Sequence, residues 1–484
     1  MTAVAYKHPK FLDNIELWET LDDVCRGQEA VKRKRERYLP RHNKLDQSPE
    51  AKAYYDSYLH RAVFYGVTKT TLSSLIGAAF ATDPSFKFPV ELDHLNRNAN
   101  GAGLSIFQLA QASLRHIMKH YRCALYVDFP TVTPSKSVAD DKNKNAYPMI
   151  HLLSAKAVIN WDSIMINNQR KLSLVVIQEV LSERGQDGFE LIERVQYRVL
   201  RLEDAGHGDY VYTVEVISQT EKNAFASLGK AIPTDYNGQY WDYIPFTFVG
   251  AIDNSDEIDT APLLDLANLN LAHYRDSADF QESVYYMGQP QYYSSGVSWS
   301  WYDEAKKRGI YIGAKTIIPL PENGKIGIAQ VNANTLAREA MSDKWAQMKE
   351  LGARLVEPGS ASRKTATQSD NDDAVQHSVL SLCAVNISEA LNNALGWCAK
   401  YAMPDPDQLT NDELNFEISQ EFSKQGYLDS LAKQLYEGAL QGRNSFKSWW
   451  EYNQTGMFPK QTYEEELEAI EAENSGVILR QAEQ

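Results

Sequence analysis

The spacing of apolar residues predicts helices at the start of the chain and strands after them. Up to about residue 121 apolar side chains recur every three to four positions, which predicts helices over residues 11–27, 48–80 and 105–121. From residue 122, β-branched and aromatic runs alternate with turn sequences such as GQDG and DAGHGD, as in an antiparallel meander. The predicted strands are residues 123–129, 172–180, 193–202 and 210–218. The first half is therefore predicted to be an α+β domain.

A long helical pattern resumes in the second half and is interrupted by one small module. Apolar spacing predicts a helix over residues 263–287 and another that ends at Pro358. Between them, residues 289–331 contain the strand-like pieces QYYSSG, IYIGAKTIIPL and KIGIAQV. A third long helix that ends before Pro404 and a mainly helical C-terminal stretch complete the pattern.

The two helices on either side of residues 289–331 are expected to pack as a hairpin. Apolar residues on the first helix cover more than one stripe of its surface, so we expect a neighbouring chain to cover part of it. These residues are Leu263, Leu264, Leu266, Ala267, Leu271, Ala272 and Tyr274. An ordinary helical domain, with the hairpin as its core, is the alternative that the pattern leaves open.

Composition and charge limit the classes of partner. The 484 residues, 43% of them apolar, suit about two to four folded domains. The net charge of −15 should repel nucleic acid and acidic membranes, so any nucleic-acid contact has to be local. No apolar run reaches the roughly 18 residues of a membrane span and no signal peptide is recognisable, so we expect a soluble chain with no membrane partner.

Little in the sequence points to catalysis. His116 and His120 lie four apart on a predicted helix, which places both rings on one face, but the glutamate and third ligand of a zinc-protease motif are missing. No GxxxxGK[ST] loop, GxSxG elbow or CxxC pair occurs, and the four cysteines are expected to be reduced core residues. We therefore expect no enzyme, metal or cofactor. The alternative is a nucleic-acid-processing metalloenzyme that uses the two histidines.

Two clusters of cations could bind partners. The run KRKRER at residues 32–37 could contact phosphates, but we favour a solvated face or a partner for acidic residues of a neighbouring subunit. Lys306, Lys307 and Arg308 lie together inside the small module, where a surface turn is the simpler interpretation.

Seven segments together resemble the portal proteins of tailed bacteriophages. They keep their order and spacing over most of residues 15–400, which makes the set more specific than any one segment. The segments are WETLDDVCRGQEAVK, RYLPRH, YYDSYLHRAVFYGVTKTTLSSLIGAAF, CALYVDFP, HLLSAKAVINW, YIPFTFVGA and APLLDLANLNLAHYRDSADFQES. The basic run at residues 32–37 departs from the family's pattern.

The resemblance implies a structural protein of the virion. Portal proteins form a dodecameric ring at one capsid vertex, through which double-stranded DNA is packaged and later ejected. Such a head-tail connector subunit, made in the host cytoplasm, would bind identical copies and the terminase large subunit. It would also bind adaptor or tail proteins and the major capsid and scaffolding proteins.

The resemblance also implies a division of the chain. The α/β wing would take residues 1–262, the stem helices 263–288 and 332–356, the clip 289–331, the tunnel loop 357–370, the long wing helix 371–403 and the helical crown 404–484.

Three sets of residues would carry this function. Small polar residues of the tunnel loop would touch DNA phosphates briefly, without sequence specificity; these are Ser360, Ser362, Arg363, Lys364 and Thr365. Cations of the clip would dock the motor or an adaptor, namely Lys306, Lys307, Arg308, Lys315 and Lys325. Subunits would pack along the stem through Leu266, Tyr274, Trp345 and Met348.

Overall fold

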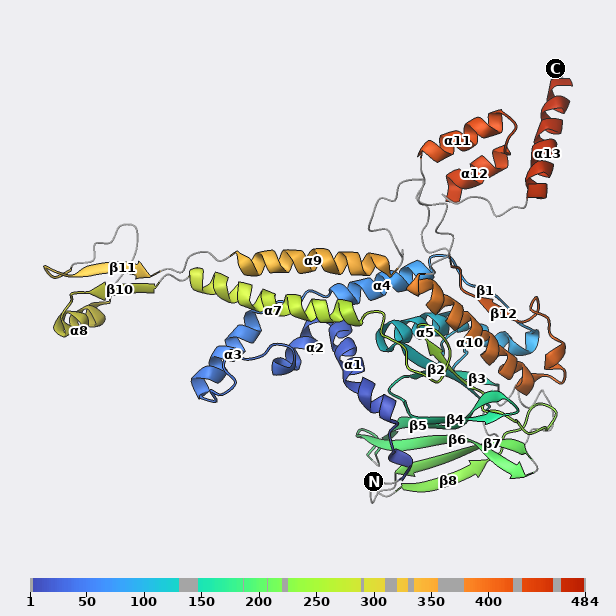
Figure 1. Ribbon diagram of the computed structural model, residues 1–484, viewed down its shortest axis with the longest axis horizontal. Coiled ribbons are helices and arrows are strands. Elements are labelled where there is room, and N and C mark those ends of the chain that lie inside the picture. Colours follow the sequence, from blue (N-terminus) through green and yellow to red (C-terminus); the bar gives the residue numbers. More distant parts are fainter. Residues whose placement is uncertain are drawn as a thin grey trace. The chain divides into compact units, whose positions relative to one another are not determined.

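Helices and antiparallel sheets both contribute to the fold, which confirms the α+β prediction (Figure 1). The chain forms two compact units, one of residues 1–76 and 86–416 and one of residues 77–85 and 417–484. The computed structural model describes residues 3–129, 147–185, 187–206, 208–219, 225–288, 291–309, 320–329, 335–355, 378–420, 429–455 and 463–482.

Polar caps fix where the N-terminal helices begin. These helices are α1 (Pro9–Arg26), α2 (Gln28–Arg33), α3 (Pro49–Arg61), α4 (Val67–Ala79) and α5 (Ile106–His120), with short 3-10 turns η1 (Ala3–Ala5), η2 (Arg35–Arg37) and η3 (Val90–Asn96). The Ser48 hydroxyl accepts from the backbone N–H of Ala51 before α3, and Ser105 forms a reciprocal capping box with Gln108 before α5. The first and third helices predicted from the sequence are thus confirmed.

The single helix predicted over residues 48–80 is two helices. The chain leaves α3 at Ala62, where φ is −55° and ψ is 140°. Ala62 and Phe64 are buried, and the backbone N–H of Phe64 donates to the Gln28 side chain at 3.1 Å. Burial of these two side chains against other elements outweighs continuation of the helix, and periodicity alone cannot detect this.

Two antiparallel sheets follow. The larger is the meander β4 (Val158–Ile166), β5 (Gln169–Arg184), β6 (Leu191–Gly206), β7 (Asp209–Gln219) and β8 (Phe225–Ala231), in that order. It confirms three of the four predicted strands as neighbours. The fourth belongs to a separate sheet of order β3 (Met149–Ser154), β2 (Arg122–Asp128) and β9 (Phe246–Gly250). β2 is central in that sheet because α5 and α10 (Val379–Ala402) pack against it, leaving its first six residues buried.

A helix hairpin carries a small module at its turn. Helices α7 (Leu264–Met287) and α9 (Leu336–Arg354) pack along each other, as the apolar spacing predicted (Figure 1). Between them, β10 (Gln291–Ser295) and β11 (Lys325–Ala329) pair antiparallel. Residues Trp299–Arg308 form helix α8 rather than strand and turn, because Ser298 caps it through the N–H of Trp301. We call β10, α8 and β11 the tip module.

Helix α7 is covered by its own chain. α1, α3 and α9 all pack against it. Asn270 also ties it to the start of α4, because its side chain accepts from Thr68 and donates to the Tyr65 carbonyl at 2.8 Å. The expectation that a neighbouring chain covers the apolar stripes of α7 is therefore wrong. Helices distant in sequence cover them, and only Val284, Tyr285 and Tyr286 near its C-terminal end stay exposed as large apolar side chains of α7.

The smaller unit contains the helices predicted near the C-terminus. They are α11 (Asp429–Leu440), α12 (Phe446–Thr455) and α13 (Tyr463–Ala482). Glu466 of α13 accepts from the backbone N–H and the hydroxyl of Ser445, immediately before α12, at 2.7 and 3.0 Å. This contact links the last two helices.

Candidate functional site

The tip module exposes large apolar side chains. Trp299 is 82% exposed, and Tyr293, Tyr302, Ile326 and Ile328 are also exposed. The Tyr293 ring lies across Gly327, where any Cβ atom would be within 3 Å of it. A two-stranded sheet has little stability by itself in water, and clustered apolar side chains at a surface mark interaction sites. The tip module is therefore the part of the hairpin that most needs a partner.

The structure places three of the five cations predicted for docking in the tip module. Lys306 and Lys307 are exposed in the last turn of α8, and Lys325 is exposed at the start of β11. The backbone of Arg308 ends α8, and Lys315 lies outside the described residues. These cations flank the exposed aromatic residues along the chain.

Three of the four residues predicted to join subunits are inside the chain's own core. Leu266, Tyr274 and Met348 are buried, so their side chains offer no surface to a second copy. Trp345 is 39% exposed on α9, with its ring 6.3 Å from that of Tyr65. Subunit packing along the hairpin can therefore rest only on Trp345 among the four.

The residues predicted to face DNA have no described position. Ser360, Ser362, Arg363, Lys364 and Thr365 lie outside the described residues, as does the rest of the predicted tunnel loop. Their role remains a prediction from the sequence.

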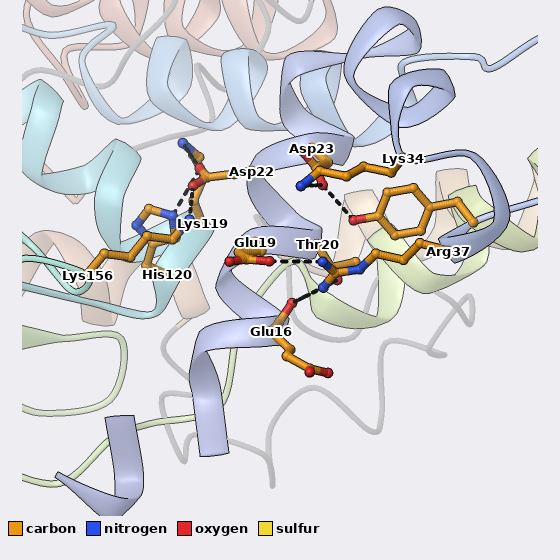
Figure 2. A network of polar contacts seen from close by, with 11 residues as sticks. Glu16, Glu19, Thr20, Asp22, Asp23, Lys34, Arg37, Lys119, His120 and Lys156 are labelled. Atoms are coloured by element: carbon orange, nitrogen blue, oxygen red, sulfur yellow. Dashed lines mark hydrogen bonds and ion pairs between the residues drawn. The ribbon is translucent and has the colours of Figure 1, made fainter. Parts of the chain in front are cut away.

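The basic run at residues 32–37 is largely neutralised within the chain. Arg37 pairs with Glu19 at 2.9 Å and donates to the Glu16 carbonyl, while Lys34 lies 3.8 Å from Asp23 (Figure 2). The hydrogen bond from Arg37 lowers the pKa of Glu19. Arg35 pairs in the same way with Asp56 of α3, and Lys32 donates to the His60 carbonyl. The acidic partners that we expected from a neighbouring subunit are thus supplied by α1 and α3.

The two histidines considered as metal ligands belong to a second polar network. His120 Nε2 lies 3.0 Å from Asp22, which also pairs with Lys119 and Lys156 at 2.6 Å each (Figure 2). Burial alone would raise the pKa of Asp22, but bonds and charges from His120, Lys119 and Lys156 hold it well below its usual value. Burial lowers the pKa of His116 to about 4. Within the described residues, no group of three or more His, Cys, Asp or Glu could hold a metal ion.

Sequence reasoning missed a groove in the larger unit. It lies between β1 (Ser85–Lys87) with η3 on one side and residues 409–413 on the other, and its cavity is about 500 Å³. The rings of Phe86 and Phe88 stack 5.7 Å apart, and the buried Phe416 of β12 (Asn415–Glu417) stacks behind Phe86. The alternation FKFPV at residues 86–90 is the only sequence signal we find for it.

Comparisons with known proteins cover part of the chain. Residues 262–402, which include α7, the tip module, α9 and α10, match the family described as "Domain of unknown function (DUF4055)". No curated protein matches the chain. No helix in the described part of the chain is long and apolar enough to cross a membrane.

Two solved structures resemble the chain at low identity. One is described as the neck of an empty GTA (gene transfer agent) particle computed with C6 symmetry, the other as the neck of a native GTA particle computed with C12 symmetry. Each shares 14% identity with this chain and aligns over 84% of it and 93% of the other chain. The TM-scores are 0.40 and 0.38, too low to establish a common fold.

Proposed function

We propose that this chain is a portal-type subunit whose copies close into a dodecameric ring at one vertex of a phage capsid. The observation that carries the proposal is the α7–α9 hairpin, which bears at its turn a module with exposed apolar side chains such as Trp299. The seven segments that resemble portal proteins support the same assignment. The subunit is thus a structural protein of the virion, made in the host cytoplasm.

A ring explains why the tip module is exposed in one chain. Identical copies that meet through two different surfaces form a closed ring when the rotation between them closes. In such a ring, tip modules of adjacent copies lie close together, so that exposed side chains such as Tyr293 and Ile328 become part of a continuous surface. This surface, with Lys306, Lys307, Arg308, Lys315 and Lys325, docks the terminase large subunit and later an adaptor or tail protein.

The ring also accounts for the acidic charge of the chain. Firm contacts between cations and phosphates release counterions and bind DNA tightly, which would hinder translocation. With a net charge of −15, most of the surface repels the duplex. Arg363 and Lys364 of the tunnel loop supply short-lived contacts to phosphates, and the absence of base contacts makes passage independent of sequence. Major capsid and scaffolding proteins hold the ring in the shell.

The mass of the purified full-length chain in solution tests this function. We expect a single large species with the mass of a dodecamer, formed without nucleic acid and retained on dilution. A chain that stays monomeric at every concentration, with a stable fold, would rule out the ring and leave the hairpin as the core of an ordinary domain.

A further inference from the structure

The groove beside β1 has an apolar floor and an acidic rim. The rings of Phe86 and Phe88 and the side chain of Val90, which is 84% exposed, form the apolar part. The rim carries Asp93, Asp412 and Glu413 against one cation, Lys87. This chemistry suits an apolar side chain that arrives beside a positive charge. The cavity of about 500 Å³ lies within the range of about 300–1,000 Å³ typical of binding sites.

The loop before α3 presents such a side chain. Leu45 is 93% exposed and follows Lys44, whose side chain is also exposed. The loop is held in shape by local bonds, because Asn43 accepts from the N–H of Leu45 and Gln47 donates to the Lys44 carbonyl, both at 3.0 Å. The acidic neighbour Asp46 is engaged by the N–H of Ser48 at 3.0 Å.

Charge separates this loop from the other exposed apolar side chains. Phe189 is 85% exposed at the β5–β6 turn, but it lies between Asp187 and Glu190, which the acidic rim would repel. Trp299 of the tip module is one helical turn before Asp303. Leu45 is the most exposed large apolar residue in the described part of the chain, and it is the one of these three that directly follows a lysine.

Loop and groove are carried by different parts of the larger unit. The loop leads into α3, which packs on α7, whereas η3 of the groove packs on α5 and α10. No hydrogen bond, ion pair or ring contact described for the chain joins them, so an encounter requires a second copy. Heterologous pairing of two different surfaces is the geometry that closes a ring.

We propose that Leu45 of one copy enters the Phe86–Phe88 groove of the next copy, with Lys44 facing Asp412. This contact rests on the proposed ring and identifies one of its interfaces. It is formed in trans, and a leucine with its neighbouring lysine matches both the apolar floor and the acidic rim.

Cross-linking in the assembled protein tests the contact. The full-length chain is made with Leu45→Cys and Val90→Cys, and a short bismaleimide is added; the native Cys25, Cys123, Cys383 and Cys398 are buried and should react little. We expect a ladder of covalent dimers and higher species on a denaturing gel, and none from either single variant. The matched control pairs Phe189→Cys, which is equally exposed, with Val90→Cys and should give no ladder.

Charge reversal provides the second readout. Lys44→Glu should lower the cross-linking yield by up to about fivefold, the range of one exposed ion pair, and Asp412→Lys added to it should restore the yield. Rings that form normally without the 45–90 ladder, or with an equal 189–90 ladder, would overturn the contact and leave the proposed function intact, the groove then serving another partner. A chain that forms no oligomer would overturn both.

Discussion

At the scale of single residues, the most constrained group is the carboxylate of Asp22. It is supplied by α1, and its three partners are Lys119 and His120 from α5 and Lys156 from the turn after β3. His120 and Lys156 are 98 and 134 residues from Asp22 in the chain, so no local pattern could have predicted the cluster. The sequence did show that His116 and His120 share a helix face, but not that His120 turns to a carboxylate.

Removing the Asp22 charge should destabilise the fold. In Asp22→Asn, Lys119 and Lys156 lose their counter-ion, and because both keep some contact with water we expect a loss near the lower end of the roughly 3–5 kcal/mol of a broken buried ion pair. Glu19→Gln, which breaks an exposed pair on the same helix, should cost about 1 kcal/mol or less. Denaturant unfolding of both variants checks this, and equal losses would contradict it.

His116 should make stability depend on pH. Burial lowers its pKa from 6.5 to about 4, so between these values the unfolded chain binds a proton that the folded chain does not. Stability is therefore expected to fall as the pH drops from about 6.5 to about 4. His116→Gln should flatten this part of the profile in thermal unfolding measured from pH 8 to pH 4. An unchanged slope would show that the ring titrates normally when folded.

At the scale of elements, spacing predicted helices well and their tertiary cover poorly. The 3.6-residue pattern located α1, α5, α7, α9 and α10, because each buries one stripe on neighbouring elements. It missed the break between α3 and α4, where burial of Phe64 decides, and helix α8, which is set by the Ser298 cap. It also failed to show that α1 and α3 cover α7.

Two residues three positions apart on α9 should separate folding from assembly. Met348 is buried, so Met348→Ala should lower the free energy of unfolding by about 2–5 kcal/mol. Trp345 is partly exposed, so Trp345→Ala should cost less stability but shift the protein toward smaller species. Unfolding and mass in solution, measured on the same samples, check the pair. A Trp345→Ala chain that assembles normally would remove this residue from the subunit interface.

At the scale of the whole molecule, the account joins an acidic chain to a function that requires DNA to move. The candidate site was predictable in kind, because the hairpin and its tip module could be located from the sequence. The groove was not predictable, since Phe86 and Leu409 meet only after folding.

The tunnel-loop prediction belongs to this scale because it concerns the assembled particle. Arg363→Ala with Lys364→Ala should leave ring formation intact and change the yield of packaged DNA, since the two cations touch phosphates and take no part in subunit packing. Packaging yield and particle mass together check this. Normal packaging with failed ring formation would instead make the loop an element of assembly.

Electron microscopy of the purified full-length chain tests the central claim most directly. The account predicts end-on views of rings with an axial opening wide enough for a DNA duplex, and side views in which the tip modules project together at one end. Compact single particles without any axial opening would contradict it.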